Sequence, residues 1–440
     1  MTNAMTQSEV ASIALMMSNI NPEKTPEPIS NENENVIQKG KIDIGKLIRF
    51  PQKHFEYLKK LETIINISNE PDFIKTQMKS IFQNDIIKIY EKKTGASGLE
   101  NFGMTCYLNS VLQCLRHTIL FNSYLFGGRI EEVITKNQTS RKVENTNITL
   151  LINYMWIVIT LWDNDNTTLS PLNFKTLFSH NFKQFSNHMQ HDAHECLVTV
   201  LDSFHDTLSR NVKYKITGEV INDLDKQIKQ AHEDWAIHYK RRHSAVLDIF
   251  SGQLQTKTVC PKCQQTTYRY DPIMAVDLPL PETTNENQSI YECFNNYVEP
   301  AILTSDNLYY CTKCKDKMQA FQVHSIWTLP NVLIIKLSRF KYTIINDNYS
   351  ASKVMDFINY PIKDLDLAQY ISSPLNKQTK YDLYGVICHE GDPERGHYYS
   401  YCNNQFKQKW YKYNDESATE IPTNAIVTKN AYVLFYQRQL

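Results

Sequence analysis

The amino-acid sequence predicts an α+β protein in which a mainly helical half precedes a half built from antiparallel strands. From Cys106 to about residue 210, apolar side chains recur at the helical spacing, as at Leu197, Val200 and Leu201. After about residue 250 the chain changes to short runs rich in Val, Ile and aromatic residues, separated by Gly, Pro, Asn and Asp. Helices followed by strands favour an α+β arrangement over a doubly wound one.

Composition limits the classes of function. The 440 residues include 47 Lys and Arg against 47 Asp and Glu, so the formal net charge is zero. This balance argues against nucleic acid or an anionic membrane as the main partner. No apolar run approaches the ~18 residues that span a bilayer, and no basic segment precedes the short apolar stretch 11–17. We expect an intracellular protein, cytoplasmic or nuclear, with no membrane span and no nucleic-acid partner.

Residues 1–95 are predicted to form an N-terminal extension that is disordered first and helical later. Residues 1 to about 45 are polar, with a Pro-, Glu- and Asn-rich stretch at 21–34. Apolar residues then follow the helical period over 57–65 and 74–89. A structural cap, a small docking element and a hairpin that binds an unknown partner all fit this pattern.

The second half contains five segments that are typical of strands because they are short, rich in β-branched and aromatic residues, and bounded by turn residues. They are Val332–Leu337, Leu383–Cys388, His397–Cys402, Lys409–Tyr413 and Tyr432–Tyr436. Before them, the charged segment Asn222–His243 around Trp235 is predicted to be an exposed helix.

Two cysteine pairs predict a structural zinc site. Cys260 and Cys263 form one CxxC motif and Cys311 and Cys314 form a second, with 47 residues between them (264 to 310). Each tight turn offers two thiolates, and two such turns complete a tetrahedral four-cysteine site for Zn2+. Either motif alone is also compatible with a redox pair or with coincidence. Because four protein ligands leave no open position on the metal, we expect structural zinc and no catalytic cofactor.

Cys106 is the candidate nucleophile. The glycine-bearing stretch Gly98–Ser110 turns into an amphipathic helix near this residue. Unpaired backbone N–H groups and the positive end of the helix dipole favour a thiolate there. Asn101 is close enough in sequence to direct its amide at charge that develops beside the sulfur. A buried structural cysteine is the alternative, so a base elsewhere in the chain is needed to favour catalysis.

His397 is the candidate base. It begins a predicted strand directly after Gly396, which permits close approach of another backbone or of a slender substrate. Asn414 follows the next predicted strand, 17 residues later, and can orient the imidazole by accepting from its ring N–H. His389, at the end of the preceding strand, is the rival base. Gly396 and the Asn414-Asp415 pair favour His397.

Several blocks of the sequence resemble those of the ubiquitin-specific proteases. Gly98–Leu115 is similar to the cysteine box of that family, and His389–Asn403 with Lys409–Ile421 is similar to its histidine box. Further similar blocks lie at 189–195, 329–340 and 431–436, and both CxxC motifs fit the family, so the resemblance spans roughly residues 97 to 438. The order Cys, His, Asn is also that of papain-like thiol proteases, although His397 lies 291 residues after Cys106 (397 minus 106).

The resemblance implies a papain-like cysteine protease fold, likened to a right hand, with mainly antiparallel sheet in the palm and fingers. The thumb, with the catalytic cysteine, would be residues 96–210. A helical connection would follow at 211–249 and zinc-ribbon fingers at 250–325. The palm, with the catalytic histidine and asparagine, would be residues 326–440.

The implied activity is hydrolysis of the peptide or isopeptide bond after the C-terminal Gly of ubiquitin. Cys106 would attack that carbonyl and form an acyl-enzyme, while His397 would take the thiol proton and later protonate the departing amine. Asn414 would orient His397, supported by Asp415. Asn101 and the backbone N–H of Cys106 would hold the oxyanion, where loss of one donor typically costs about 10²–10³ in rate.

The resemblance also implies that ubiquitin, ubiquitinated proteins and polyubiquitin chains are the partners. Asp192 and Glu195 match positions that engage the basic tail of ubiquitin, a role that their charge suits independently. Acidic residues are also common at a helix N-terminus for electrostatic reasons, and both explanations can hold together. Gly396 and Tyr398 of the histidine box are further candidates for ubiquitin contact.

Two other functions remain as alternatives. A catalytically weak scaffold would bind ubiquitin through the same palm surface without cleaving it. A zinc ribbon can also bind nucleic acid, although the zero net charge argues against this function.

The sequence departs from the family pattern at three positions. Met104 stands where Asn is usual, which removes a polar group near the nucleophile, and His194 stands where Gln is usual. Asn414 in place of Asp is a known variation in the family. We expect Met104 to change the rate more than the kind of reaction.

Overall fold

The computed structural model describes residues 93–126, 145–187, 189–213, 215–240, 242–281, 288–304, 307–345, 348–393 and 395–439. The N-terminal extension predicted for residues 1–95 lies outside these ranges apart from its last three residues, and so do the two helices predicted within it. Within the described ranges, no helix has both the length and the apolar character needed to cross a bilayer.

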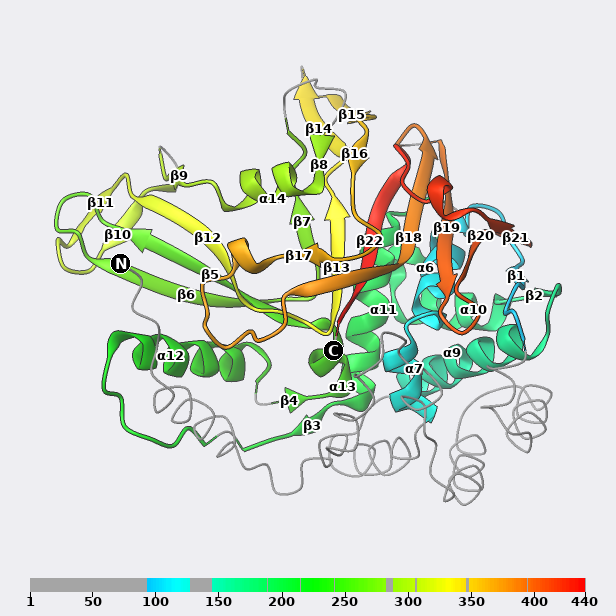
Figure 1. Ribbon diagram of the computed structural model, residues 1–440, viewed down its shortest axis with the longest axis horizontal. Coiled ribbons are helices and arrows are strands. Elements are labelled where there is room, and N and C mark those ends of the chain that lie inside the picture. The colour runs from blue at the N-terminus through cyan, green and yellow to red at the C-terminus, as the bar shows by residue number, and fades with distance from the viewer. Residues whose placement is uncertain are drawn as a thin grey trace.

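The first part of the described chain is helical, as the spacing of its apolar residues predicts. Its helices are α6 (Cys106–Arg116), α7 (Ile119–Phe126), α9 (Asn145–Asp163), α10 (Leu172–Asn181) and α11 (Ala193–Leu208), with the short helix η2 (Lys183–Phe185) before α11. They gather at the right of Figure 1. Asp192 caps α11, because its side chain accepts hydrogen bonds from the backbone N–H groups of His194 and Glu195.

The larger sheet contains all five strands predicted in the second half, so that prediction is confirmed. In the described chain its order is β21–β20–β19–β18–β22–β13–β7, with β17 also paired to β18, and its pairs are antiparallel apart from β13–β7. The strands are β7 (Val276–Leu278), β13 (Val332–Leu337), β17 (Leu365–Asp366), β18 (Lys380–Gly391), β19 (Gly396–Asn404), β20 (Lys409–Asn414), β21 (Ser417–Ile421) and β22 (Ala431–Arg438). β13 has the predicted bounds, and the other four predicted strands are longer than expected.

A second sheet, of order β6–β5–β12–β9, extends to the left in Figure 1, away from the helices of the first part of the chain. Its strands are β5 (Gly252–Val259), β6 (Thr266–Ile273), β9 (Ala301–Ile302) and β12 (Phe321–Thr328), and the hairpin of β10 (Tyr309–Cys311) and β11 (Asp316–Met318) lies near its far end. The helix α12 (Asp223–His238) lies along this sheet, where Ile228 and Ala231 pack against Tyr270 and Trp327. The helix predicted around Trp235 is thus confirmed, although it ends at His238.

Shorter elements connect these parts. The segment 211–249, predicted as a helical connection, carries α12, most of α13 (Ala245–Phe250) and β4 (Arg242–His243), which pairs with β3 (Arg210–Asn211). The remaining elements are α14 (Ile290–Val298), β1 (Gly98–Leu99) with β2 (Thr168–Leu169), β8 (Gln288–Ser289) with β16 (Ile358–Asn359), β14 (Phe340–Ile345) with β15 (Asn348–Lys353), and the short helices η4 (Ala368–Tyr370) and η5 (Thr423–Ala425).

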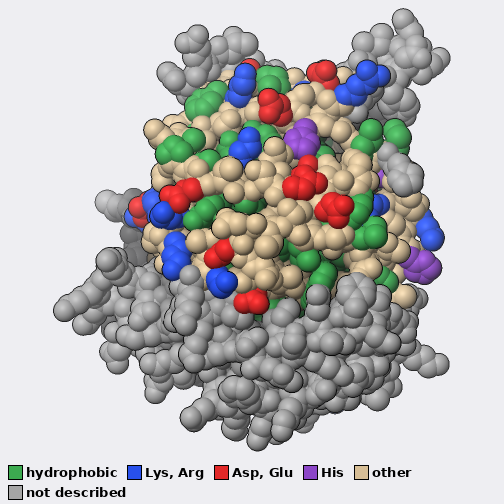
Figure 2. Space-filling model, turned by 90° about the vertical axis from the view of Figure 1, so that its right-hand side faces the viewer, with side chains coloured by type: hydrophobic (Ala, Val, Ile, Leu, Met, Phe, Trp, Pro, Cys, Tyr) green, Lys and Arg blue, Asp and Glu red, His purple; other side chains and the backbone are tan. Residues whose placement is uncertain are grey.

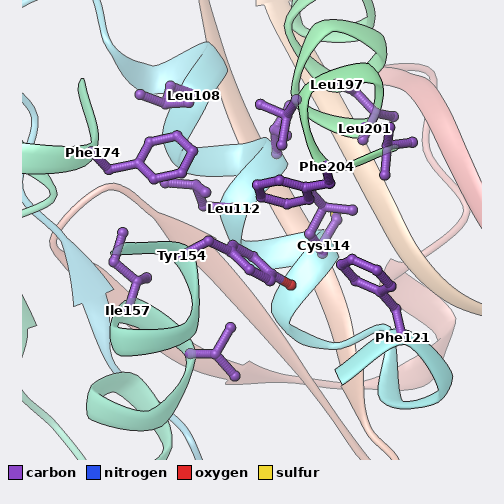
Figure 3. Packing of buried hydrophobic residues seen from close by; sticks show 14 of the residues in the cluster. Leu108, Leu112, Cys114, Phe121, Tyr154, Ile157, Phe174, Leu197, Leu201 and Phe204 are labelled. Carbon is purple, nitrogen blue, oxygen red and sulfur yellow. The ribbon is translucent and has the colours of Figure 1, made fainter. Parts of the chain in front are cut away.

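The hydrophobic core lies on both faces of the larger sheet. Along β22, Val433 and Phe435 join the cluster on the helical side, whereas Leu434 and Tyr436 join the cluster on the opposite side, as the two-residue period of a strand requires. Figure 3 shows the helical side, where Leu108 and Leu112 of α6 meet aromatic and aliphatic side chains from the other helices; the labelled partners are Phe121, Tyr154, Ile157, Phe174, Leu197, Leu201 and Phe204. Because α6 packs across β19 and β18, its first residue lies at the end of β19 where His397 stands.

Candidate active site

A tight turn brings Cys106 to the start of α6. Gly103 and Met104 both have left-handed backbone conformations, with φ of +70° and +45°. The side-chain oxygen of Asn101 accepts from the backbone N–H of Thr105 at 3.1 Å and from its hydroxyl at 3.0 Å, which closes the turn. Cys106 follows as the first residue of the helix, among its unpaired N–H groups, and is 2% exposed.

His397 stands between Cys106 and Asn414. Its Nε2 lies 2.6 Å from Oδ1 of Asn414. Because a carboxamide oxygen only accepts, Nε2 carries a proton, which leaves Nδ1 to face the sulfur. A hydrogen bond with Cys106, together with the one to Asn414, raises the pKa of His397 to about 9 despite the opposing effect of partial burial. At neutral pH the ring is therefore protonated.

The carboxylate of Asp415 joins the cysteine turn to the histidine strand. Its Oδ2 accepts from Nδ2 of Asn101 at 2.8 Å, and its Oδ1 accepts from Nδ2 of Asn109 at 2.8 Å. The same Oδ2 lies 3.7 Å from Nε2 of His397. The amide of Asn101, predicted to point at charge beside the sulfur, thus donates one of its two hydrogens to Asp415.

The chain before Cys106 also runs directly against the turn after Asn414. The backbone N–H of Leu99 donates to the carbonyl of Asp415 at 2.8 Å, and that of Asn101 donates to the Glu416 carboxylate at 2.9 Å. A Cβ at Gly98 would lie 2.1 Å from the carbonyl oxygen of Glu416, so only glycine permits this approach. These contacts explain how Cys106 and the residues around Asn414 meet despite their separation in sequence.

Position 396 also requires glycine, because its neighbours leave no space for a Cβ atom. A Cβ there would lie 1.9 Å from Nε2 of His389. His389, the rival base, is 1% exposed, with its ring against Phe340 and Tyr398. Burial lowers the pKa of His389 to about 3, so this ring stays neutral. His397 and not His389 is the imidazole that contacts Cys106.

The residues predicted to bind ubiquitin differ in accessibility. Glu195 is exposed on the first turn of α11, whereas Asp192 caps that helix and also accepts from the hydroxyl of Tyr432. Tyr398 is buried, with its ring centroid 4.5 Å from that of His389. Burial also lowers the pKa of His194, which stands where the family usually has Gln.

Two amides near the site have no signal of their own in the sequence. Asn109 follows Cys106 by one helical turn and is buried. Gln190 lies between η2 and α11, and its side chain bonds both main-chain polar groups of Gly396. Asn109 lies inside the block similar to the cysteine box, and Gln190 lies two residues before Asp192, but the partners of both amides lie far away in the chain.

The four cysteines of the CxxC motifs converge between the β5–β6 and β10–β11 turns. All four sulfur atoms lie within 4.8 Å of one another, with 3.9 Å between Cys260 and Cys314 and 3.6 Å between Cys263 and Cys311. Tetrahedral zinc with bonds of about 2.3 Å places its sulfur ligands roughly 3.8 Å apart. The donor set and its spacing therefore fit a structural zinc ion.

The face at the thumb end of the molecule has no single charge type. In Figure 2, acidic, basic and hydrophobic side chains are intermixed over the described part of this face. This pattern agrees with the zero net charge of the chain.

Comparisons with known proteins connect this geometry to a family. The family model described as ubiquitin carboxyl-terminal hydrolase matches residues 97–436. The chain is 30% identical over 354 residues to ubiquitin carboxyl-terminal hydrolase Usp2 of Drosophila melanogaster, covering 79% of this chain and 35% of that protein. It is 29% identical over 345 residues to ubiquitin carboxyl-terminal hydrolase 2 of Homo sapiens, covering 78% of this chain and 55% of that protein. The chain thus spans about half the length of these relatives or less.

A solved structure shares the architecture. The SAGA DUB module of Ubp8, Sgf11, Sus1 and Sgf73 bound to monoubiquitin matches with a TM-score of 0.58 and 24% identity, over 80% of this chain and 70% of that chain. The predicted α+β fold, with its helical thumb, antiparallel palm and cysteine-bearing fingers, is confirmed.

Proposed function

The chain belongs to the ubiquitin carboxyl-terminal hydrolase family, and on that premise we propose that it is a thiol-dependent deubiquitinating enzyme. It would hydrolyse the peptide or isopeptide bond after the C-terminal Gly of ubiquitin. The observation that carries this proposal is that His397 lies beside Cys106, at the start of α6, and is hydrogen-bonded to Asn414.

The reaction proceeds through an acyl-enzyme. The thiolate of Cys106 attacks the carbonyl carbon, and His397 transfers its Nδ1 proton to the departing amine. Water then attacks the thioester while His397 takes a proton from it, which releases the C-terminal carboxyl group of ubiquitin and restores the thiolate beside the protonated imidazole. Asn414 keeps the imidazole in the tautomer and orientation that both steps need.

The oxyanion has two candidate donors. The backbone N–H of Cys106 is unpaired at the first residue of α6. Asn101 retains one amide hydrogen after its bond to Asp415, which supports its assignment as the second donor. Removal of one such donor typically costs about 10²–10³ in rate.

Ubiquitin, on ubiquitinated proteins or in polyubiquitin chains, is the proposed partner. The SAGA DUB module of similar fold is bound to monoubiquitin. The exposed carboxylate of Glu195 suits the basic tail of ubiquitin, and Asp192, Gly396 and Tyr398 are proposed to contribute to the same ubiquitin-binding surface. Asp192 would act mainly through Tyr432, to which it is hydrogen-bonded, and Tyr398 would act mainly through its contact with His389.

Zinc is proposed to hold the fingers together. Cys260, Cys263, Cys311 and Cys314 would be its ligands and would leave no position open for catalysis. All ten cysteines of the chain are free of disulfide bonds, which supports an intracellular location, cytoplasmic or nuclear, where thiols stay reduced.

A ubiquitin probe with a C-terminal electrophile tests the proposal. We expect covalent capture of the wild-type chain, none of Cys106→Ala, and much slower capture of His397→Ala. His180→Ala, at an exposed histidine of α10, is the matched control and should be captured like the wild type. Binding of ubiquitin without capture would instead identify a scaffold.

A further inference from the structure

The main chain just before His397 is held by a side chain from the thumb. The carbonyl of Gly396 accepts from Nε2 of Gln190, and the N–H of Gly396 donates to Oε1 of Gln190 at 3.0 Å. A side-chain carboxamide carries an acceptor oxygen and an NH2 donor in one plane. It can therefore bind both the N–H and the C=O of a single residue, as a neighbouring strand would.

This bond fills a gap in the sheet. β18 pairs with β19 as far as Gly391 and Gly396, but β20 pairs with β19 only from Ser400 onward. The N–H and C=O of Gly396 therefore lie beyond the end of the β20 ladder, on a strand edge that needs partners. Gln190 supplies them from a segment 206 positions away.

The opposite side of the same turn is also anchored. Nζ of Lys353 donates to the carbonyl of His389 at 2.7 Å and to that of Gly391 at 3.0 Å. The ring of His389 fills the space beneath Gly396, where no Cβ fits. With these supports in place, Gln190 holds the open edge of the strand from which His397 projects.

We propose that Gln190 is a positioning residue that sets the imidazole of His397 over Cys106 by holding the main chain of Gly396. The inference rests on the proposed catalytic role of the Cys106–His397 pair. Gln190 lies two residues before Asp192, which is bonded to Tyr432 on β22, so one short thumb segment is tied to two palm strands. The position of the thumb is thereby linked to that of the base.

The test compares Gln190→Ala and Gln190→Glu with the wild type. Gln190→Glu keeps the length and the acceptor for the N–H of Gly396 but has no donor for its carbonyl. Gln184→Ala, at an exposed glutamine of η2, is the matched control. Two readouts are used: the rate of Cys106 alkylation by iodoacetamide against pH, followed at that residue by mass spectrometry, and kcat and KM with a ubiquitin substrate.

We expect both Gln190 variants to alkylate Cys106 more slowly at neutral pH, because the imidazolium beside the sulfur is displaced. We also expect kcat to fall by about 10²-fold in Gln190→Ala, as a shift of about 1 Å can produce, with KM unchanged. The control should match the wild type in every measurement.

Three results would overturn the inference. Alkylation profiles and kcat like those of the wild type would show that Gln190 does not position His397. A raised KM with unchanged kcat would show that Gln190 contacts ubiquitin and does not position His397. A raised kcat would show that Gln190 holds His397 in a less active position. Alkylation of Cys106 does not require ubiquitin. If the wild type failed to cleave ubiquitin, the proposed function would be refuted, and the alkylation rates would still test the role of Gln190.

Discussion

The side-chain amide of Asn109 donates to Oδ1 of Asp415 at 2.8 Å across 306 positions of sequence. Asp415 is nearly buried, with a side chain 9% exposed and a left-handed φ of +49°. A carboxylate in such a place needs donors, and Asn109 and Asn101 provide them from the two sides of Cys106. The helix that carries Cys106 therefore also fixes the turn that follows Asn414.

Substitution of Asn109 should damage both folding and catalysis. Asn109→Ala leaves one oxygen of Asp415 without a donor, which should cost about 1–3 kcal/mol in the free energy of unfolding and lower kcat/KM. Asn109→Asp should be worse, because it places a second carboxylate against the first. Urea unfolding and ubiquitin hydrolysis measure these effects, with Asn164→Ala, at an exposed asparagine, as control. Equal behaviour of all three variants would contradict the assigned role.

Asn414→Ala should move the alkaline limb of activity to lower pH. The bond to Asn414 helps to raise the pKa of His397 to about 9, and the active form carries the ring proton, so activity falls as pH rises through that pKa. Without the bond the pKa should fall, and activity should be lost at lower pH than in the wild type. Asn414→Asp keeps the acceptor and adds a negative charge, so the alkaline limb of its pH profile should not move to lower pH. The pH profile of kcat/KM for the three proteins provides the measurement.

His389 should make the fold sensitive to acid. Its folded pKa of about 3 lies below the ordinary value near 6.5, so the unfolded chain binds a proton between these limits and stability falls as pH drops below 6.5. Between pH 7.5 and pH 5 this loss amounts to about 2 kcal/mol. The neutral variant His389→Gln should lose about that much less over the same interval in denaturant titrations. Identical pH dependence in the two proteins would refute the assignment.

Removal of metal should weaken the fingers without changing the chemistry. Cys311→Ser deletes one of four converging sulfur ligands, so bound zinc, thermal stability and ubiquitin affinity should all fall. The rate of Cys106 alkylation should not change, because Cys311 lies in the β10–β11 hairpin, apart from the larger sheet that carries His397. Metal analysis, thermal unfolding and binding assays check this. Stoichiometric zinc together with normal ubiquitin affinity in the variant would contradict the proposal that zinc holds the fingers together.

Met104→Asn should stabilise the cysteine turn. Met104 has a φ of +45°, a conformation that costs most residues roughly 1–2 kcal/mol and that Asn tolerates better. Its side chain is 49% exposed, so little packing is lost. The variant should unfold at a higher temperature than the wild type. Met104→Ala, which keeps the backbone cost, should not gain this stability.

The sequence predicted the elements, and it singled out residues that the structure brings together, because those signals are local. Strand periodicity located β13 to the residue, and CxxC spacing identified the four sulfurs that converge. The roles of Asn109 and Gln190 could not be read in this way, since each amide acts on a partner 306 or 206 positions away. The direction of the Asn101 amide likewise depends on Asp415, whose approach is set by Gly98 and Glu416.

The approach of Gly98 to Glu416 has a consequence for protein synthesis. Leu99 is hydrogen-bonded to Asp415, so the segment that shapes the Cys106 turn depends on a residue 316 positions later in the sequence (415 minus 99). A ribosome must therefore synthesise the chain as far as Glu416 before the candidate site can close. A chain that ends before His397 would carry the thiol of Cys106 without the imidazole that lies beside it in the folded protein.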